Sequence, residues 1–104
     1  MSRPKRGRTE KREAARRSVK LAEGREKLFS REPGGSAERP LEVEGAAVIE
    51  LRARAVPCPL CDGEQMVLEH AAVTVAAERL REVRLQCRRC GTKRSLWFRI
   101  ALLN

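Results

Sequence analysis

The chain has 104 residues, enough for one small domain, and its 23 Lys and Arg residues outnumber 14 Asp and Glu residues to give a net charge of +9. No stretch reaches the ~18 apolar residues that cross a bilayer, and no apolar segment follows the charged N-terminus, so we expect neither a membrane protein nor a secreted one. We therefore expect a cytoplasmic protein, with the nucleus or nucleoid as alternatives, in which cysteines stay reduced and excess positive charge favours a polyanionic partner.

Most of the positive charge lies in residues 1–40, which carry 13 basic and 6 acidic side chains. Residues 1–8 have no apolar residue after the initiator methionine, and we expect them to be disordered. Residues 9–29 predict a helix, because Thr9 can cap it and apolar residues recur at seven-residue intervals. Residues 30–40 contain two prolines and two glycines and predict a linker. The expected result is a basic N-terminal arm, partly helical or disordered, that is dispensable for folding.

Residues 41–104 are expected to form a small all-β domain. Four segments alternate apolar and polar residues or are rich in β-branched residues, as strands are. The predicted strands cover 47–56, 64–75, 79–87 and 95–103. The second strand has an alternative, because residues 71–83 could instead begin a helix. In the fourth strand the alternation places Phe98 and Trp97 on opposite faces.

Four cysteines form two CxxC pairs, Cys58 and Cys61 in CPLC and Cys87 and Cys90 in CRRC, with 25 residues between the pairs. This pattern is typical of a structural Zn²⁺ site, because each tight turn can aim two sulfurs at one ion about 2.3 Å away. A domain with so few aromatic residues also needs stabilisation beyond its apolar core. Structural zinc supplies roughly 10–16 kcal/mol of apparent folding free energy. We expect one structural Zn²⁺ bound by four thiolates.

Three other uses of the cysteines fit less well. A thioredoxin-type redox pair opens a helix and needs no second CxxC. Two disulfides would suit a secreted chain. Iron shares the four-thiolate ligand set, but rubredoxins surround it with aromatic residues that this chain lacks, so iron is the alternative metal.

The two knuckles, CPLCDG and CRRCGTK, each lead into a predicted strand. At these residues the chain resembles the zinc ribbon group, over roughly residues 56–100. The resemblance implies a zinc ribbon-like antiparallel sheet of three to four strands within residues 41–104. The group includes parts of transcription factors, RNA polymerase subunits, ribosomal proteins and elongation factors. It therefore implies work associated with nucleic acid more often than catalysis, without indicating a specific family.

We expect no enzymatic activity, because a closed four-thiolate site has no open coordination position and the only histidine, His70, has no cysteine at ligand spacing. Basic residues around the second knuckle are the candidate nucleic-acid contacts, although part of their charge must offset the formal −2 of zinc with four thiolates. Trp97 is either a ring that stacks on bases or a structural residue. The candidate contacts are Arg84, Arg88, Arg89, Lys93, Arg94, Trp97 and Arg99.

The leading hypothesis is a non-enzymatic zinc-binding protein that binds DNA or RNA electrostatically as an accessory factor. The alternative is a protein-interaction adaptor that docks on a transcription or translation assembly, with Leu21, Leu28 and Phe29 of the arm helix in a partner's groove. A thiol redox or zinc-sensing protein is the third hypothesis.

Overall fold

The computed structural model describes residues 7–101, and the disorder expected for residues 1–8 falls mostly on residues 1–6, outside the described part. The last predicted strand also ends outside it, at residues 102 and 103. No helix between residues 7 and 101 is long and apolar enough to cross a membrane. The elements in chain order are α1 (Gly7–Ser30), β1 (Leu41–Val43), the short 3-10 helix η1 (Ala46–Val48), α2 (Ile49–Ala55), β2 (Gln65–Val75), β3 (Glu78–Cys87) and β4 (Lys93–Ile100).

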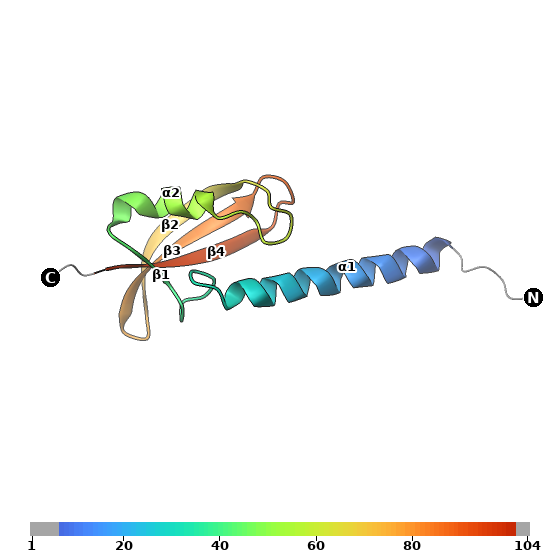
Figure 1. The fold of residues 1–104 in the computed structure, drawn as a ribbon, viewed down its shortest axis with the longest axis horizontal. Coiled ribbons are helices and arrows are strands. Elements are labelled where there is room, and N and C mark those ends of the chain that lie inside the picture. Colours follow the sequence, from blue (N-terminus) through green and yellow to red (C-terminus); the bar gives the residue numbers. More distant parts are fainter. Residues whose placement is uncertain (1–6, 102–104) are drawn as a thin grey trace, which may run out of the picture.

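The strands form one mixed sheet in the order β1-β4-β3-β2, shown in Figure 1. Strands β2, β3 and β4 are an antiparallel meander, and the short β1 runs parallel to β4. The three long strands confirm three of the predicted strands and exclude a helix at 71–83. Ala76 and Ala77 join β2 to β3 with φ angles of 50° and 67°, as a two-residue hairpin turn with left-handed residues requires.

The strand predicted over 47–56 is wrong, because these residues form most of η1 and all of α2. Ile49 and Ala53 are fully buried, whereas Leu51 is 64% exposed. Burial therefore repeats every four residues, as on one face of a helix, and not every two. Ala, Leu, Arg and Glu also favour helix over strand. With α1 and α2 beside the sheet, the domain is sheet-rich but not all-β.

The core lies between the sheet and the segments packed on it, with α2 lying against β2 and β3 (Figure 1). The fully or almost fully buried side chains include Val83, Leu85, Leu96 and Phe98 from the sheet and Ile49 and Ala53 from α2. Phe29, near the end of α1, belongs to the same cluster and is 8% exposed. The adaptor hypothesis expected Phe29 to enter a partner's groove. Phe29 is instead buried in the core of its own domain.

The predicted linker is ordered against the sheet. Gly34 has a φ of 87°, and its N–H donates to the carbonyl oxygen of Arg39 at 2.6 Å. The N–H of Trp97 on β4 donates to the Gly34 carbonyl oxygen at 2.9 Å. With Phe29 in the core, these bonds argue against the expectation that residues 1–40 are dispensable for folding.

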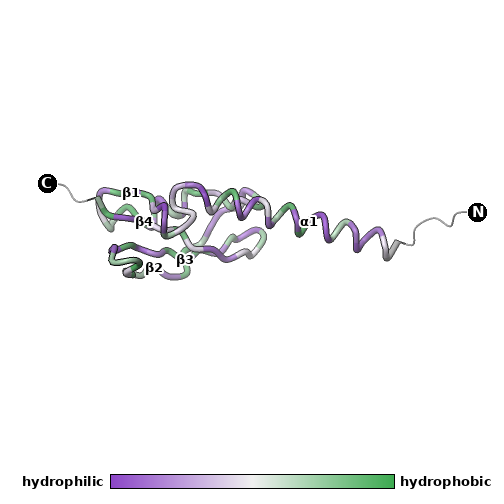
Figure 2. The backbone as a smooth tube through the Cα atoms, turned by 90° about the horizontal axis from the view of Figure 1, so that it is seen from below, coloured by the Kyte–Doolittle hydropathy of each residue, from purple (hydrophilic) through white to green (hydrophobic). Residues whose placement is uncertain are grey.

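Helix α1 confirms the helix predicted in the arm. Its 24 residues make a rod of about 36 Å, and only its C-terminal part lies under the sheet (Figure 1). The outer turns extend past the end of the sheet and are mostly hydrophilic, as Figure 2 shows. The helix is therefore anchored at one end and projects from the domain at the other.

We expect Phe29→Ala to lower the free energy of unfolding by about 3–5 kcal/mol, the usual cost of emptying a buried phenylalanine site. Leu28→Ala is the matched control, because Leu28 is the next residue along α1 and is 63% exposed. The control should change stability by no more than about 0.5 kcal/mol. Urea unfolding of both variants with zinc present tests the difference, and equal stabilities would show that α1 is not anchored by Phe29.

Candidate metal centre

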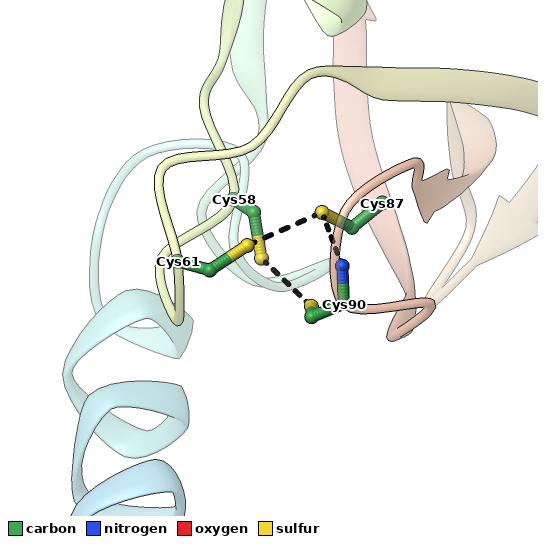
Figure 3. A group of neighbouring side chains, drawn as sticks. All are labelled: Cys58, Cys61, Cys87 and Cys90. Carbon is green, nitrogen blue, oxygen red and sulfur yellow. Dashed lines mark hydrogen bonds between the residues drawn. The ribbon is translucent and has the colours of Figure 1, made fainter.

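The four cysteines meet at the end of the sheet from which α1 projects. Cys58 and Cys61 lie in the loop between α2 and β2, Cys87 ends β3, and Cys90 lies in the turn before β4. Their Sγ atoms all lie within 4.8 Å of one another, and Figure 3 shows them pointing toward a common centre.

The sulfur positions fit a tetrahedral metal ion. Four sulfurs at about 2.3 Å from one zinc ion would be about 3.8 Å apart. The Sγ atoms of Cys58 and Cys90 are 3.7 Å apart, and those of Cys61 and Cys87 are 3.4 Å apart. Each of these pairs joins one knuckle to the other (Figure 3). The cluster can therefore hold one metal ion between the knuckles, and four thiolates are a ligand set typical of zinc.

The first knuckle is closed by two backbone hydrogen bonds around Cys58. The N–H of Cys58 donates to the carbonyl oxygen of Gly63 at 3.1 Å, and the N–H of Asp62 donates to the carbonyl oxygen of Cys58 at 2.8 Å. Asp62 takes a φ of 58°, a left-handed conformation that aspartate tolerates better than most residues. The Asp-Gly pair after CPLC therefore makes the turn that closes the first knuckle.

The second knuckle repeats this pattern around Cys87. Its N–H donates to the carbonyl oxygen of Thr92 at 3.0 Å, and the N–H of Gly91, with a φ of 78°, donates to the carbonyl oxygen of Cys87 at 2.9 Å. The N–H groups of Arg89 and Cys90 also point at the Cys87 sulfur, at 3.3 and 3.4 Å. Such amides stabilise a thiolate and fix its direction toward the ion.

The thiols of the cluster differ in acidity. Burial raises the pKa of Cys61 to about 12, and the Cys87 sulfur beside it adds to the rise. Hydrogen bonding with the side chain and backbone of Thr92 lowers the pKa of Cys90 to about 6, and the N–H of Cys90 lowers the pKa of Cys87. A metal ion binds the thiolate form only, so binding must release the remaining protons and weaken as the pH falls.

The charged side chain of Arg94 contacts this cluster. Its Nη2 lies 3.6 Å from the Sγ of Cys58, and its Nη1 lies 2.8 and 2.9 Å from the two carboxylate oxygens of Glu26 on α1. The guanidinium also lies over the ring of Phe29, 5.4 Å from its centroid. The side chain is 4% exposed, so Arg94 is held inside the structure and has little surface left for a phosphate. Its charge instead offsets the negative charge of the thiolates.

The structure separates the other candidate contacts into free and engaged side chains. Arg88 and Lys93 are exposed, and neither has an acidic partner among residues 7–101. Arg84 is also exposed, on the middle of β3. Arg89 is exposed, but its Nη1 donates to the carbonyl oxygen of Cys61 at 3.3 Å and so joins the two knuckles.

Two candidate contacts lie on β4, away from the knuckles. Arg99 forms ion pairs with Glu42 at 2.5 Å and Glu78 at 2.9 Å, which raise the pKa of its guanidinium and offset its charge. Trp97 is half-buried and lies in register with Glu82 of β3. Neither side chain lies beside the unpaired cations of the second knuckle.

Sequence reasoning missed Glu26 and the close approach of Gly63 to the second knuckle. Glu26 is one of several acidic residues in a charged helix, and nothing in the local pattern indicates that Arg94, far along the chain, contacts it. Gly63 is recognisable from the sequence as a residue of the knuckle turn, but its closeness to the second knuckle is a tertiary feature.

The comparisons with known proteins add no relative. No family model matches the chain, and no curated protein or solved structure is significantly similar to it. The resemblance to zinc ribbons therefore rests on the two knuckles and on the geometry of the four sulfurs.

We expect Gly63→Ala to disrupt metal binding. A Cβ at this position would lie 2.7 Å from the Sγ of Cys87 and 3.1 Å from the Sγ of Cys61, so the ligands would have to move apart. Gly45→Ala is the control, because a Cβ there meets nothing within 4 Å. Zinc per chain and competition with a chelator measure the effect. A Gly63→Ala protein with unchanged zinc affinity would contradict this account of the site.

We expect Arg94→Met and Glu26→Gln each to loosen the last turns of α1, because either change breaks the ion pair beside the cysteine cluster. Amide hydrogen exchange over residues 20–30 measures the loosening. The double variant should lose less protection than the sum of the single losses, since the two side chains act on each other. Additive losses would show that Arg94 holds the cluster without holding the helix.

Proposed function

We propose that this is a non-enzymatic zinc-binding protein that binds nucleic acid through a basic surface around its metal centre, as an accessory factor. The four converging sulfurs support the metal, and zinc is the ion to which this ligand set is best suited. With four thiolates as ligands, the ion has a structural role, because no coordination position is left for water or substrate.

The single observation that carries the nucleic-acid role is the charge of the second knuckle. Residues 87–94 contain four basic residues and no acidic one. Arg94 is engaged at the metal centre, but Arg88 and Lys93 are exposed without acidic partners within the described residues, and Arg89 is exposed as well. Positive side chains kept in water without counter-charges favour a phosphate backbone as ligand.

Helix α1 adds to the same surface. Arg25 on α1 donates through Nη1 to the carbonyl oxygen of Leu60 in the first knuckle at 2.8 Å, so the helix runs alongside the metal centre. The helix carries eight basic and four acidic residues between Gly7 and Ser30. The basic arm and the two knuckles are therefore adjacent.

A second function, a protein-interaction adaptor, is favoured by exposed apolar side chains on α1. Leu21 and Leu28, which are seven residues apart and so lie on one face of the helix, are 64% and 63% exposed. These side chains could enter a groove on a larger assembly. Salt dependence separates the two functions, because phosphate binding weakens steeply with salt and apolar docking does not.

A thiol redox or zinc-sensing role is the third proposal. Cys90 is the most exposed of the four cysteines. Thiol titration of the metal-loaded protein tests this role, because thiolates coordinated in a structural site react slowly.

We expect Arg88→Glu/Lys93→Glu to weaken binding to nucleic acid and to reduce the salt slope by about 2, since each lost phosphate contact removes about 0.9 on a duplex. Zinc content and melting temperature should not change, because neither side chain contacts the cluster. Fluorescence anisotropy over a series of salt concentrations measures the binding.

The control for this pair is Arg52→Glu/Arg79→Glu, which makes the same charge change at exposed positions on α2 and at the start of β3. It should weaken binding less, because Arg79 lies at the opposite end of β3 from the metal. If full-length protein shows no salt-sensitive binding to any nucleic acid at low ionic strength, the adaptor function becomes the better proposal.

A further inference from the structure

The contacts of α1 define which of its faces points toward the domain. Phe29 is buried in the core and Glu26 is paired with Arg94. One and two turns further out, Ala22 and Val19 line a groove whose other wall includes Leu60 of the first knuckle. Residues three and four apart lie on one face of a helix, so these four helix residues mark the domain-facing line of α1.

Beyond the knuckles the same line is basic. Four residues before Val19 the line reaches Ala15. Three and four residues before Ala15 it reaches Arg12 and Lys11, both exposed, on turns that project past the sheet (Figure 1). The acidic residues of these outer turns, Glu10 and Glu13, lie on the opposite side of the helix by the same periodicity. The domain-facing line of α1 is therefore positively charged on the outer turns, where it extends beyond the knuckles.

The second knuckle supplies basic side chains on the other side of the groove. Lys93 lines the groove between α1 and the knuckles, and Arg88 is exposed on the same knuckle. A ligand held between the projecting helix and the knuckle would meet cations from both. The groove itself includes Glu23 and Glu26, so the positive potential is greatest at the outer turns and the knuckle, and not at its floor.

The aromatic residues argue against an unpaired strand as the ligand. The chain has one Trp, two Phe and no Tyr, and all three rings lie within the described residues. Phe29 and Phe98 are buried in the core, and Trp97 is half-buried on β4. Proteins that bind single strands stack bases on exposed rings, worth roughly 1–3 kcal/mol per base. The basic surface of this protein has no such ring.

The width of the helix distinguishes duplex DNA from duplex RNA as the ligand. An α-helix with side chains is about 10–12 Å across and fits the major groove of B-form DNA, which is about 12 Å wide. The major groove of A-form RNA is too narrow for it. We infer that the ligand is B-form duplex DNA, with the outer half of α1 in the major groove and the second knuckle on the adjacent phosphates. This inference rests on the proposed nucleic-acid function.

The first test compares three ligands of one sequence and length: duplex DNA, single-stranded DNA and duplex RNA. Zinc-loaded full-length protein should bind duplex DNA about tenfold or more tightly than the other two, with a salt slope of about −0.9 per contacted phosphate. Equal or tighter binding to the single strand or to duplex RNA would overturn the inference and leave the proposed function standing. Binding to none of the three would overturn both.

The second test uses two charge reversals on one helix. Lys11→Glu/Arg12→Glu alters the domain-facing line, and Arg17→Glu/Lys20→Glu makes the same charge change on the far side of α1, where both residues are also exposed. We expect the first variant to lose at least about tenfold in affinity for duplex DNA and about 2 in salt slope. The second should lose much less. Equal losses would mean that α1 attracts DNA diffusely and does not enter its groove. Circular dichroism checks that both variants keep their helix content.

Discussion

The convergence of four sulfurs on one point constrains most of the structure. Two chain segments must bring their turns within bonding distance of a single ion, and strand pairing achieves this, because Gln65 at the start of β2 lies opposite Cys87 at the end of β3. Each knuckle continues directly into the hydrogen-bonded sheet. A metal ion held there would fasten one end of the sheet, while the apolar core packs between the sheet and α2. In a chain with so few large apolar residues, both contributions are needed.

The negative charge of such a centre must be offset, and the fold uses a buried arginine for this. Arg94 lies opposite Leu85 in the β3–β4 pairing, so its side chain extends from the core face of the sheet toward Cys58. From there it also pairs with Glu26 and covers the ring of Phe29. One side chain thus connects the metal site, the sheet and α1. Because a buried charge is costly without partners, the helix and the metal site stabilise each other through it.

This arrangement decides which cations remain available to a ligand. Arg94 and Arg99 are engaged in ion pairs, whereas Arg88 and Lys93 remain in water beside the projecting helix. From the composition alone, these four basic residues would be equally good candidates for contacting a ligand. At the cysteine end of the molecule, exposed cations lie on the knuckle and on the outer turns of α1, with Arg12 among them. Metal binding and the proposed nucleic-acid contacts therefore use neighbouring parts of one end, and a zinc-dependent fold would position both.

The sequence by itself determined the features that depend on neighbouring residues. The two CxxC pairs with their turn residues, the three long strands and the helix of the arm follow from spacing and periodicity within short segments. The tertiary structure decided the rest. Residues 47–56 fit a period of two as well as a helical one, and the burial of Ile49 and Ala53 against the sheet selects the helix that their weak propensities also favour. The roles of Glu26 and Phe29 depend on Arg94, more than sixty residues away. Contacts between distant residues leave no local periodicity, so no pattern within the arm could indicate that its last turns belong to the core.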